Sequence, residues 1–311
     1  MDEVFQRRGM GWIRDYPDLR DFTVECDTLT PKLKEAGQKE TVKSMLKKIG
    51  VASIPKAKLP ASVDLQAYFS PVEDQGDLGS CTANAGIGLF EFFEKKAYGT
   101  YIDGSRLFLY KTTRNLMHCT GDTGAFIRTT MGAMVLFGIP PEEFWPYNTA
   151  DFELEPTAFC YAYGQNYQAI NYYRLDPSGT NKDDLLTRIR TNLAAGLPSM
   201  FGFTVYDSYR QASRSGKIPF PVASDSVVGG HAIVAAGYDD SMKIKNEARK
   251  AKETVGALLI RNSWGRAWGD NGYGWLPYEY ILKGLAVDWW SLLKAGWVDT
   301  GVFGIGKSER E

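Results

Sequence analysis

The sequence predicts an α+β fold in which a helical half precedes a β-rich half. From Cys81 to about Tyr147, apolar residues recur at helical spacing. From about Tyr167 onward, short apolar runs of the kind found in buried strands dominate. The chain has 311 residues, of which 44% are hydrophobic, so it can bury a sizeable core.

This pattern divides the chain into an extension and a folded region. Residues 1–56 precede the regular pattern, and we expect them to form an N-terminal extension. Residues 57–311 make up the folded region. Within it, residues 57–160 are the mostly helical half and residues 161–311 are the β-rich half.

Three helices are predicted in the helical half. They run from Cys81 to Ala97, from Ser105 to Thr113 and from Ala125 to Phe137. Ser80 is a suitable N-cap for the first helix. A helix that begins at Cys81 places the thiol at the positive end of the helix dipole, which favours the thiolate.

Three apolar runs in the β-rich half predict strands, and one helix interrupts them. The strands are expected at Leu197 to Val205, Val227 to Tyr238 and Ala257 to Arg261. The helix is expected at Lys182 to Ala195, with Asn181 as its cap.

Two other segments of the β-rich half are predicted from charge and spacing. In the charged insertion Asp239 to Gly256, the pair Asp239-Asp240 and the basic run Lys243 to Lys252 are expected to form a solvated loop or helix. The segment Tyr280 to Trp297 places leucines and Trp289 at helical spacing, so it predicts a helix packed into the core.

Cys81 is the candidate nucleophile of the chain. A neutral thiol attacks carbonyl carbon poorly, and the thiolate needs a neighbouring cation or a helix N-terminus. The chain has two histidines, so an imidazole partner is His118 or His231. His118 lies in a polar, turn-like stretch, whereas His231 begins an apolar strand that can hold its ring against a fixed thiol. We therefore predict that His231 is the partner.

Two side-chain amides complete this candidate catalytic group. Asn262 follows a predicted strand, and its amide oxygen can accept from one imidazole nitrogen and turn the other toward the thiol. Trp264 can cover that bond from water. Gln75 lies six residues before Cys81, and its amide can donate to a developing oxyanion together with the backbone N–H of Cys81.

These residues and their surroundings resemble the papain family of cysteine proteases. His231 follows Cys81 by 150 residues, a spacing found in that family. The run Gly79-Ser80-Cys81-Thr82-Ala83-Asn84-Ala85 resembles a bacterial subset of the family. Phe144-Trp145-Pro146-Tyr147 and Asn262-Ser263-Trp264-Gly265 are similar to two further family motifs. The resemblance extends over roughly residues 59–280.

The resemblance implies a papain-like fold and a proteolytic activity. In this fold a helical subdomain, which carries the nucleophile helix, packs against a β-rich subdomain, and the active-site cleft lies between them. The expected activity is peptide-bond hydrolysis through a thioester acyl-enzyme on Cys81, most simply by an endopeptidase. Leu78 stands where the family usually has a half-cystine, so that disulfide is absent.

The resemblance also implies a set of substrate-binding residues. Gly124 matches the glycine strip that binds substrate backbone, and Gly229 and Ala232 match a pocket for the second residue before the scissile bond. Because these two residues are small, we expect a hydrophobic or aromatic side chain there. The full set of candidates is Gly79, Ser80, Gly124, Gly229, Gly230, Ala232 and Trp264.

The resemblance implies that residues 1–56 are a pro-segment that lies in the cleft. The protein would then be a zymogen, activated by a cut near Lys56 or Lys58 in the linker-like stretch from Gly50 to Leu59. The alternative is a permanent N-terminal arm.

The amino-acid composition argues against nucleic acid and membranes as partners. The net charge of −1 gives no general attraction to nucleic acid, and no apolar run predicts a membrane span. We expect a monomer that acts on peptides or proteins and uses no cofactor and no metal. The chain starts without a recognisable signal peptide, so we expect it in the cytoplasm or exported by a route that needs none.

Alternative functions use the same residues. One is an exopeptidase of the same family, and another is a catalytically inactive binding protein on the same fold. The set Gln75, Cys81, His231 and Asn262 is intact, which disfavours the inactive protein. A transglutaminase normally orients its imidazole with a carboxylate, whereas this chain offers Asn262.

Overall fold

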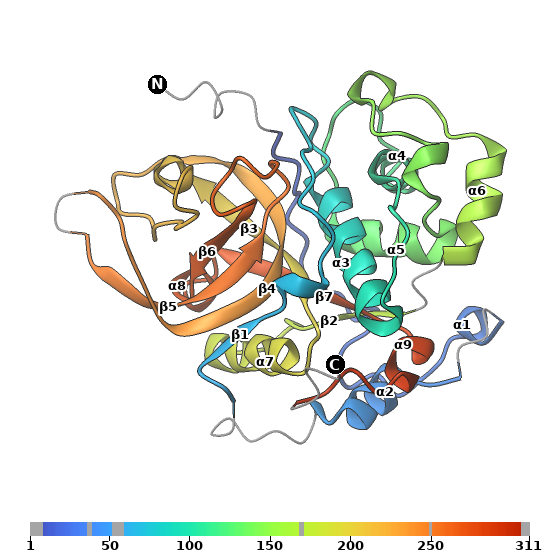
Figure 1. Ribbon diagram of the computed structural model, residues 1–311, viewed down its shortest axis with the longest axis horizontal. Helices are drawn as coiled ribbons and strands as arrows, with labels where there is room; N and C mark the ends of the chain where they lie inside the picture. Colours follow the sequence, from blue (N-terminus) through green and yellow to red (C-terminus); the bar gives the residue numbers. More distant parts are fainter. Residues whose placement is uncertain (1–8, 36–38, 52–58, 168–170, 249–250, 306–311) are drawn as a thin grey trace.

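The computed structural model describes residues 9–35, 39–51, 59–167, 171–248 and 251–305. Its helices α3 to α6 lie on one side of an antiparallel sheet (Figure 1). Within the described residues, no helix is both long enough and apolar enough to cross a membrane.

The helical half is built around α3, which begins at Cys81 and ends at Tyr98. This helix is buried along most of its length because small residues and large apolar residues alternate on its surface. Gly88 lets the sheet approach closely, since a Cβ there would lie 2.4 Å from a guanidinium nitrogen of Arg261. The remaining helices of this half are α4 (Arg106–Leu116), α5 (Ile127–Phe137), α6 (Ala158–Gly164) and the 3-10 turns η4 (Gln66–Tyr68), η5 (Glu142–Phe144), η6 (Thr149–Asp151) and η7 (Gln165–Tyr167).

The β-rich half is a seven-stranded antiparallel sheet. Its strand order is β2-β7-β3-β4-β5-β6, and β1 pairs with β4. The strands are β1 (Ser62–Asp64), β2 (Asn171–Arg174), β3 (Ser199–Tyr206), β4 (Val227–Lys245), β5 (Glu253–Arg261), β6 (Tyr273–Pro277) and β7 (Ala286–Leu293). The accompanying helices are α7 (Lys182–Ala194), η8 (Asp207–Ala212), α8 (Glu279–Leu282) and α9 (Ala295–Asp299).

Most predicted elements are present within a few residues of their predicted ends. Asn181 caps α7, because its side chain accepts from Asp184 N. Gly138 follows α5 with a φ of 71°, so this helix ends where predicted. The predicted strands correspond to β3, to the first part of β4 and to the second part of β5.

Within the charged insertion Asp239 to Gly256, the prediction of a solvated loop or helix is wrong for Asp239, Asp240 and residues 243–245, which belong to β4. Strands β4 and β5 continue into this segment and pair there as a hairpin, with Lys243 opposite Val255 and Ile244 opposite Thr254. Ile244 is buried between two exposed lysines, which is the period-two pattern of a strand.

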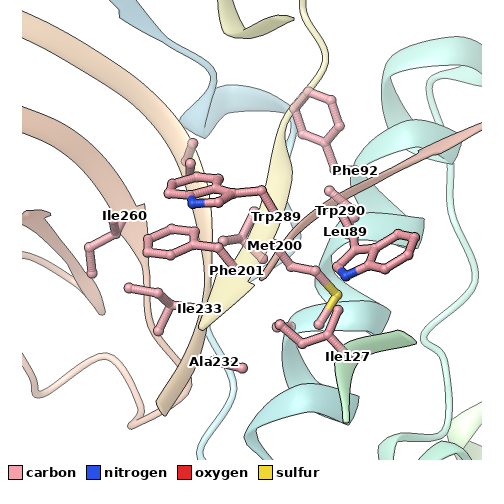
Figure 2. Close-up of a cluster of buried hydrophobic side chains, with 14 of the residues drawn as sticks. Leu89, Phe92, Ile127, Met200, Phe201, Ala232, Ile233, Ile260, Trp289 and Trp290 are labelled. Carbon is pink, nitrogen blue, oxygen red and sulfur yellow. The ribbon is translucent and has the colours of Figure 1, made fainter. Parts of the chain in front are cut away.

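The prediction of one helix from Tyr280 to Trp297 is also wrong. The segment forms α8, strand β7 and α9, and every residue of β7 is buried. A strand covered on both faces has a continuous apolar run, so spacing alone cannot distinguish it from a buried helix. Trp289 stacks on Phe201 at 3.9 Å between ring centroids, while Trp290 points toward the helices (Figure 2).

The extension contributes two helices, α1 (Pro31–Glu35) and α2 (Val42–Ile49). Helix α2 packs against α9 at the base of the molecule (Figure 1). The apolar face of α2 is buried in the main core. It consists of Val42, Met45, Leu46 and Ile49. The predicted cut positions Lys56 and Lys58 lie outside the described residues.

Candidate active site

Cys81 is the first residue of α3 and is completely buried. Its Sγ accepts hydrogen bonds from two backbone N–H groups, those of Ala232 and Gly11, each at 3.4 Å. Ser80 occupies the N-cap position, but its hydroxyl does not cap the helix. That hydroxyl instead pairs with the Tyr147 hydroxyl at 2.5 Å. The backbone N–H groups of Cys81 and Thr82, at the start of the helix, also face the thiol and favour its ionised form.

His231 lies on β4 and is held by Asn262, which directly follows β5. The distance between His231 Nε2 and Asn262 Oδ1 is 2.8 Å. Asn262 Oδ1 also accepts from Ser263 N, and its Nδ2 donates to the Tyr209 hydroxyl. Both contacts require the oxygen to face the ring, so Nε2 carries the proton. Nδ1 is left as the acceptor, and it has no hydrogen-bond partner among the described residues.

Aromatic rings cover this imidazole–amide pair. The Trp264 ring lies 4.8 Å from the imidazole, centroid to centroid, and is buried. The Tyr209 ring stands edge-on to Trp264 at 5.1 Å. This cover keeps water from the bond between His231 and Asn262.

Gln75 is fixed at both ends of its side chain. Its Oε1 accepts from the Ser263 hydroxyl at 2.5 Å, and its Nε2 donates to Leu78 O at 2.8 Å. The same Nε2 also donates to Gly9 O at 2.9 Å. The amide therefore faces a carbonyl oxygen of the N-terminal extension.

Residues 9–13 make further backbone hydrogen bonds around the thiol, and we call them the 9–13 segment. Ala125 N donates to Gly11 O at 2.7 Å, and Ile13 N donates to Ala125 O at 3.0 Å. Across from these bonds, Trp12 N donates to Gly230 O at 3.2 Å. Ala125 belongs to the helical half and Gly230 to the sheet, so the 9–13 segment lies between the two halves.

Burial sets the charge state of this pair. It raises the pKa of the Cys81 thiol to about 11, against the lowering effect of the N–H groups of Ala232 and Gly11. Burial also lowers the pKa of His231 to about 4, although the bond to Asn262 acts in the opposite direction. Both groups are therefore neutral near pH 7 in this closed arrangement.

The predicted substrate-binding residues surround the 9–13 segment. A Cβ at Gly124, where φ is 73°, would lie 2.2 Å from Gly11 O, and one at Gly229 would lie 2.7 Å from Met10 Sδ. Gly79 N donates to the Asp122 carboxylate. Gly230 and Ala232 contribute the backbone bonds described above, and Ser80 and Trp264 lie beside Cys81 and His231 respectively.

Three residues at the site were not among the candidate site residues predicted from the sequence. Ala125 contacts the 9–13 segment through its backbone N and O, which leave no trace in the side-chain pattern. Tyr209 lies in a short 3-10 turn and supports Asn262. The Asp122 carboxylate accepts hydrogen bonds from Gly79 N and from the Tyr110 hydroxyl. It therefore connects the loop before Cys81 with the glycine strip.

The other histidine and the other cysteines lie elsewhere. His118 is in an exposed turn after α4, with a φ of 55°. All four cysteines fall in the described part of the chain and are free thiols, namely Cys26, Cys81, Cys119 and Cys160.

In this structure an antiparallel sheet faces a buried helix that begins with cysteine. The histidine lies on one strand and the asparagine directly follows the neighbouring strand, which is the arrangement of a papain-like cysteine peptidase. Residues 59–281 match the family model described as papain family cysteine protease. The chain belongs to the papain family of cysteine proteases and is a thiol-dependent peptide hydrolase.

Individual relatives agree with this assignment. The chain is 32% identical to an uncharacterised peptidase C1-like protein of Acanthamoeba polyphaga mimivirus, over 93% of this chain and 88% of that protein. It is similar to the crystal structure of xylellain, a cysteine protease from Xylella fastidiosa, with a TM-score of 0.70 and 32% identity over 93% of this chain and 97% of that one. Cathepsin K of Gallus gallus is 27% identical over 70% of this chain and 58% of that protein.

Proposed function

We propose that the protein is an endopeptidase in which Cys81 is the nucleophile and His231 its general base and acid. The bond between His231 Nε2 and Asn262 Oδ1 carries this proposal, because it leaves Nδ1 as a proton acceptor. Asn262 orients the ring without adding negative charge.

The reaction proceeds in two steps. The Cys81 proton passes to His231 Nδ1, and the sulfur attacks the carbonyl carbon of the scissile bond. The imidazolium then protonates the leaving amine as the C–N bond breaks, which leaves a thioester. Water, deprotonated by His231, attacks the thioester, and the C–S bond breaks to release the acid and the thiol.

Gln75 and the backbone N–H of Cys81 stabilise the oxyanion of both steps. Gln75 Nε2 already donates to a peptide carbonyl, Gly9 O, and Ser263 holds the other end of the amide. A fixed donor of this kind supplies roughly 3 kcal/mol of transition-state stabilisation. We expect Gln75→Ala to lower kcat by about a hundredfold or more.

We also propose that the protein is a zymogen whose 9–13 segment blocks the substrate cleft. This segment bonds to the thiol through Gly11 N, to the oxyanion donor through Gly9 O and to the glycine strip through Ala125. The group of this segment that contacts the sulfur is the backbone N–H of Gly11, and an N–H group is not an electrophile. The segment therefore inhibits the thiol without being a substrate of it.

Labelling of Cys81 by an epoxide inhibitor of cysteine proteases tests both proposals, with intact mass as the readout. The proteins are the full-length chain and its variants Gly11→Ala and Cys81→Ala. A Cβ at Gly11 would lie 1.7 Å from Gly79 O, so this substitution expels the 9–13 segment without shortening the chain. Gly132→Ala is the matched control, since its Cβ would meet nothing within 4 Å.

The proposals predict slow labelling of the full-length chain and of Gly132→Ala, rapid single labelling of Gly11→Ala and none of Cys81→Ala. Equally rapid labelling of the full-length chain and Gly11→Ala would overturn the zymogen proposal. Absence of labelling in every protein would favour the inactive binding protein.

A further inference from the structure

Lys96 is a buried lysine near the C-terminal end of α3, and the peptidase mechanism does not use it. We propose that Lys96 and the cavity beside it form a binding site for a small carboxylate that has an apolar body. The site lies apart from the substrate cleft, because α3 carries Cys81 as its first residue and roughly 20 Å of helix separates the two side chains. This inference goes beyond the proposed peptidase function and does not depend on it.

Lys96 occupies a position of α3 at which an apolar residue is expected. It follows Phe92 and Phe93 by one helical turn, and both of these side chains are completely buried. Lys96 itself is only 8% exposed. A buried ammonium group without a partner is unfavourable, and an apolar side chain would fit the same face without that cost. Packing alone therefore does not account for a lysine at this position.

The ammonium group of Lys96 has no hydrogen-bond or ion-pair partner among the described residues. Its Nζ lies 3.9 Å from the centre of the Tyr68 ring and 5.7 Å from the centre of the Phe303 ring. These rings stabilise a cation, but an ammonium group also carries three N–H donors. Nζ can therefore still donate to an anion that is placed beside it.

A cavity of about 490 Å³ lies beside Lys96, which forms part of its lining. This volume falls within the range of small-molecule sites, about 300–1,000 Å³. The cavity lies at the base of the molecule, between β1 and the end of α7 (Figure 1). Most of its wall is apolar and is formed by Val63, Leu65, Leu193, Ala195, Val302 and Ile305.

Backbone contacts fix the shape of this cavity. Gly304 N donates to Ala195 O at 2.9 Å, so the C-terminal wall is bonded to the turn that follows α7. Gly196 lies in the same turn with a φ of 79°, and a Cβ there would lie 2.8 Å from Lys96 Cε. The glycine therefore lets this turn pack against the lysine stem. A site that is already formed binds its ligand without a cost for ordering its walls.

The charges around the cavity favour a ligand with a single negative charge. Among the described residues that line it, Lys96 is the only cation and Asp64 the only anion. Asp64 is exposed, and its carboxylate accepts from Gln66 N at 2.8 Å and from Gln66 Nε2 at 3.2 Å. One carboxylate beside Lys96 makes a neutral pair, whereas a dianion would bury a charge without a partner. The apolar walls require the rest of the ligand to be apolar.

Recognition of a carboxylate requires Lys96 to be protonated. Burial lowers the pKa of Lys96 to about 8 by desolvation, so the amine is mostly protonated at pH 7. The other ionisable residues around the cavity are Tyr68, which contacts the amine, and Asp64. The segments 193–196 and 302–305 carry none. As the pH rises above 8, Lys96 loses its proton, so the affinity for a carboxylate should fall.

Isothermal titration calorimetry of the full-length chain with octanoate and with octanamide tests this site. Octanamide has the shape of octanoate but carries no charge. At pH 7 we expect octanoate to bind about tenfold more tightly or better, the effect of a hydrogen bond between charged groups. This preference should shrink as the pH rises above 8.

A variant of Lys96 tests whether the amine recognises the carboxylate. Lys96→Met replaces the ammonium group with an apolar group of similar length, so it should bind octanamide as the wild type does and lose the preference for octanoate. Lys283→Met makes the same change of net charge at an exposed position and should keep the preference. Thermal unfolding without ligand checks that both variants are folded.

Equal affinity of the wild type for octanoate and octanamide would overturn recognition of a carboxylate by Lys96. The same preference in the wild type and in Lys96→Met would place the carboxylate elsewhere, and would overturn the inference as well. Absence of binding by both ligands would show that the cavity does not take this class of molecule. None of these results depends on the labelling of Cys81, which tests the peptidase function separately.

Discussion

Two parts of the N-terminal extension, the 9–13 segment and α2, are held to the molecule in different ways. The 9–13 segment is held by backbone hydrogen bonds to Ala125, Gly230 and the active-site side chains, and by a single buried side chain, that of Trp12. Helix α2 is held by apolar side chains that belong to the main core. The 9–13 segment is therefore suited to leave, whereas α2 is suited to stay.

The free energies of hydrogen bonds and of apolar burial support this distinction. A net hydrogen bond contributes about 0.5–1.5 kcal/mol to stability, and it is replaced by a bond to water or substrate when the segment leaves. Burial of one large aliphatic side chain contributes about 1.5–3 kcal/mol, and α2 buries four. Loss of α2 would expose this core, so it would destabilise the folded enzyme.

The chain between these two parts is accessible to a protease. Tyr16 is 69% exposed, and Leu19 is fully exposed. A cut in residues 14–20 would release the 9–13 segment and leave α2 in place. We therefore expect activation by a cut there, rather than by loss of the whole extension after a cut near Lys56 or Lys58.

The largest expected effect comes from the core side of α2. Met45 is fully buried, so Met45→Ala should lower the free energy of unfolding by about 2–5 kcal/mol. Chemical denaturation measures this value, and Lys47→Ala, an exposed position of the same helix, is the control. A change below about 0.5 kcal/mol would show that α2 is also a detachable element.

The next effect concerns the pH at which Cys81 ionises. Burial under the 9–13 segment raises the pKa of the thiol to about 11, and desolvation is the main cause. Removal of the segment readmits water, so the pKa in Gly11→Ala should be lower than in the full-length wild type. The ultraviolet absorbance of the thiolate, with Cys81→Ala as the blank, measures both values. Identical titrations would contradict the account.

A smaller effect is expected from Trp12. Trp12→Phe keeps an aromatic ring but loses the N–H that Asp288 accepts. Since a bond to a charged acceptor contributes about 1.5–3 kcal/mol, epoxide labelling of Cys81 should become roughly tenfold faster or more. Leu19→Ala, at a fully exposed position of the same extension, should leave the labelling rate unchanged. Equal rates for the two variants would mean that the bond between Trp12 and Asp288 does not retain the segment.

The elements that could be predicted are those determined by residues close to one another in the sequence. The cysteine at a helix start, the Asn181 cap and the alternating apolar runs of β3, β4 and β5 depend on residues near one another in the chain. Strand β7 could not be predicted in this way, because both of its faces are buried and its run of apolar residues has no period.

The remaining features depend on tertiary contacts. Ala125 acts through its backbone, and Asp288 is aimed by a bulge that forms when β7 pairs with β3. Trp12 lies 276 residues away from Asp288 in the chain. Spacing along a sequence carries no information about such contacts, so they became evident only in the folded structure.

The central claim is that the 9–13 segment blocks an otherwise competent peptidase. Its most direct test is the rate of peptide hydrolysis by the full-length chain, by Gly11→Ala and by Gly132→Ala, at equal concentration and with folding checked by thermal unfolding. The account predicts that Gly11→Ala hydrolyses peptides roughly a hundredfold faster than the other two, since expulsion of the segment breaks several hydrogen bonds of about 1 kcal/mol each. Equal hydrolysis by all three proteins would contradict it.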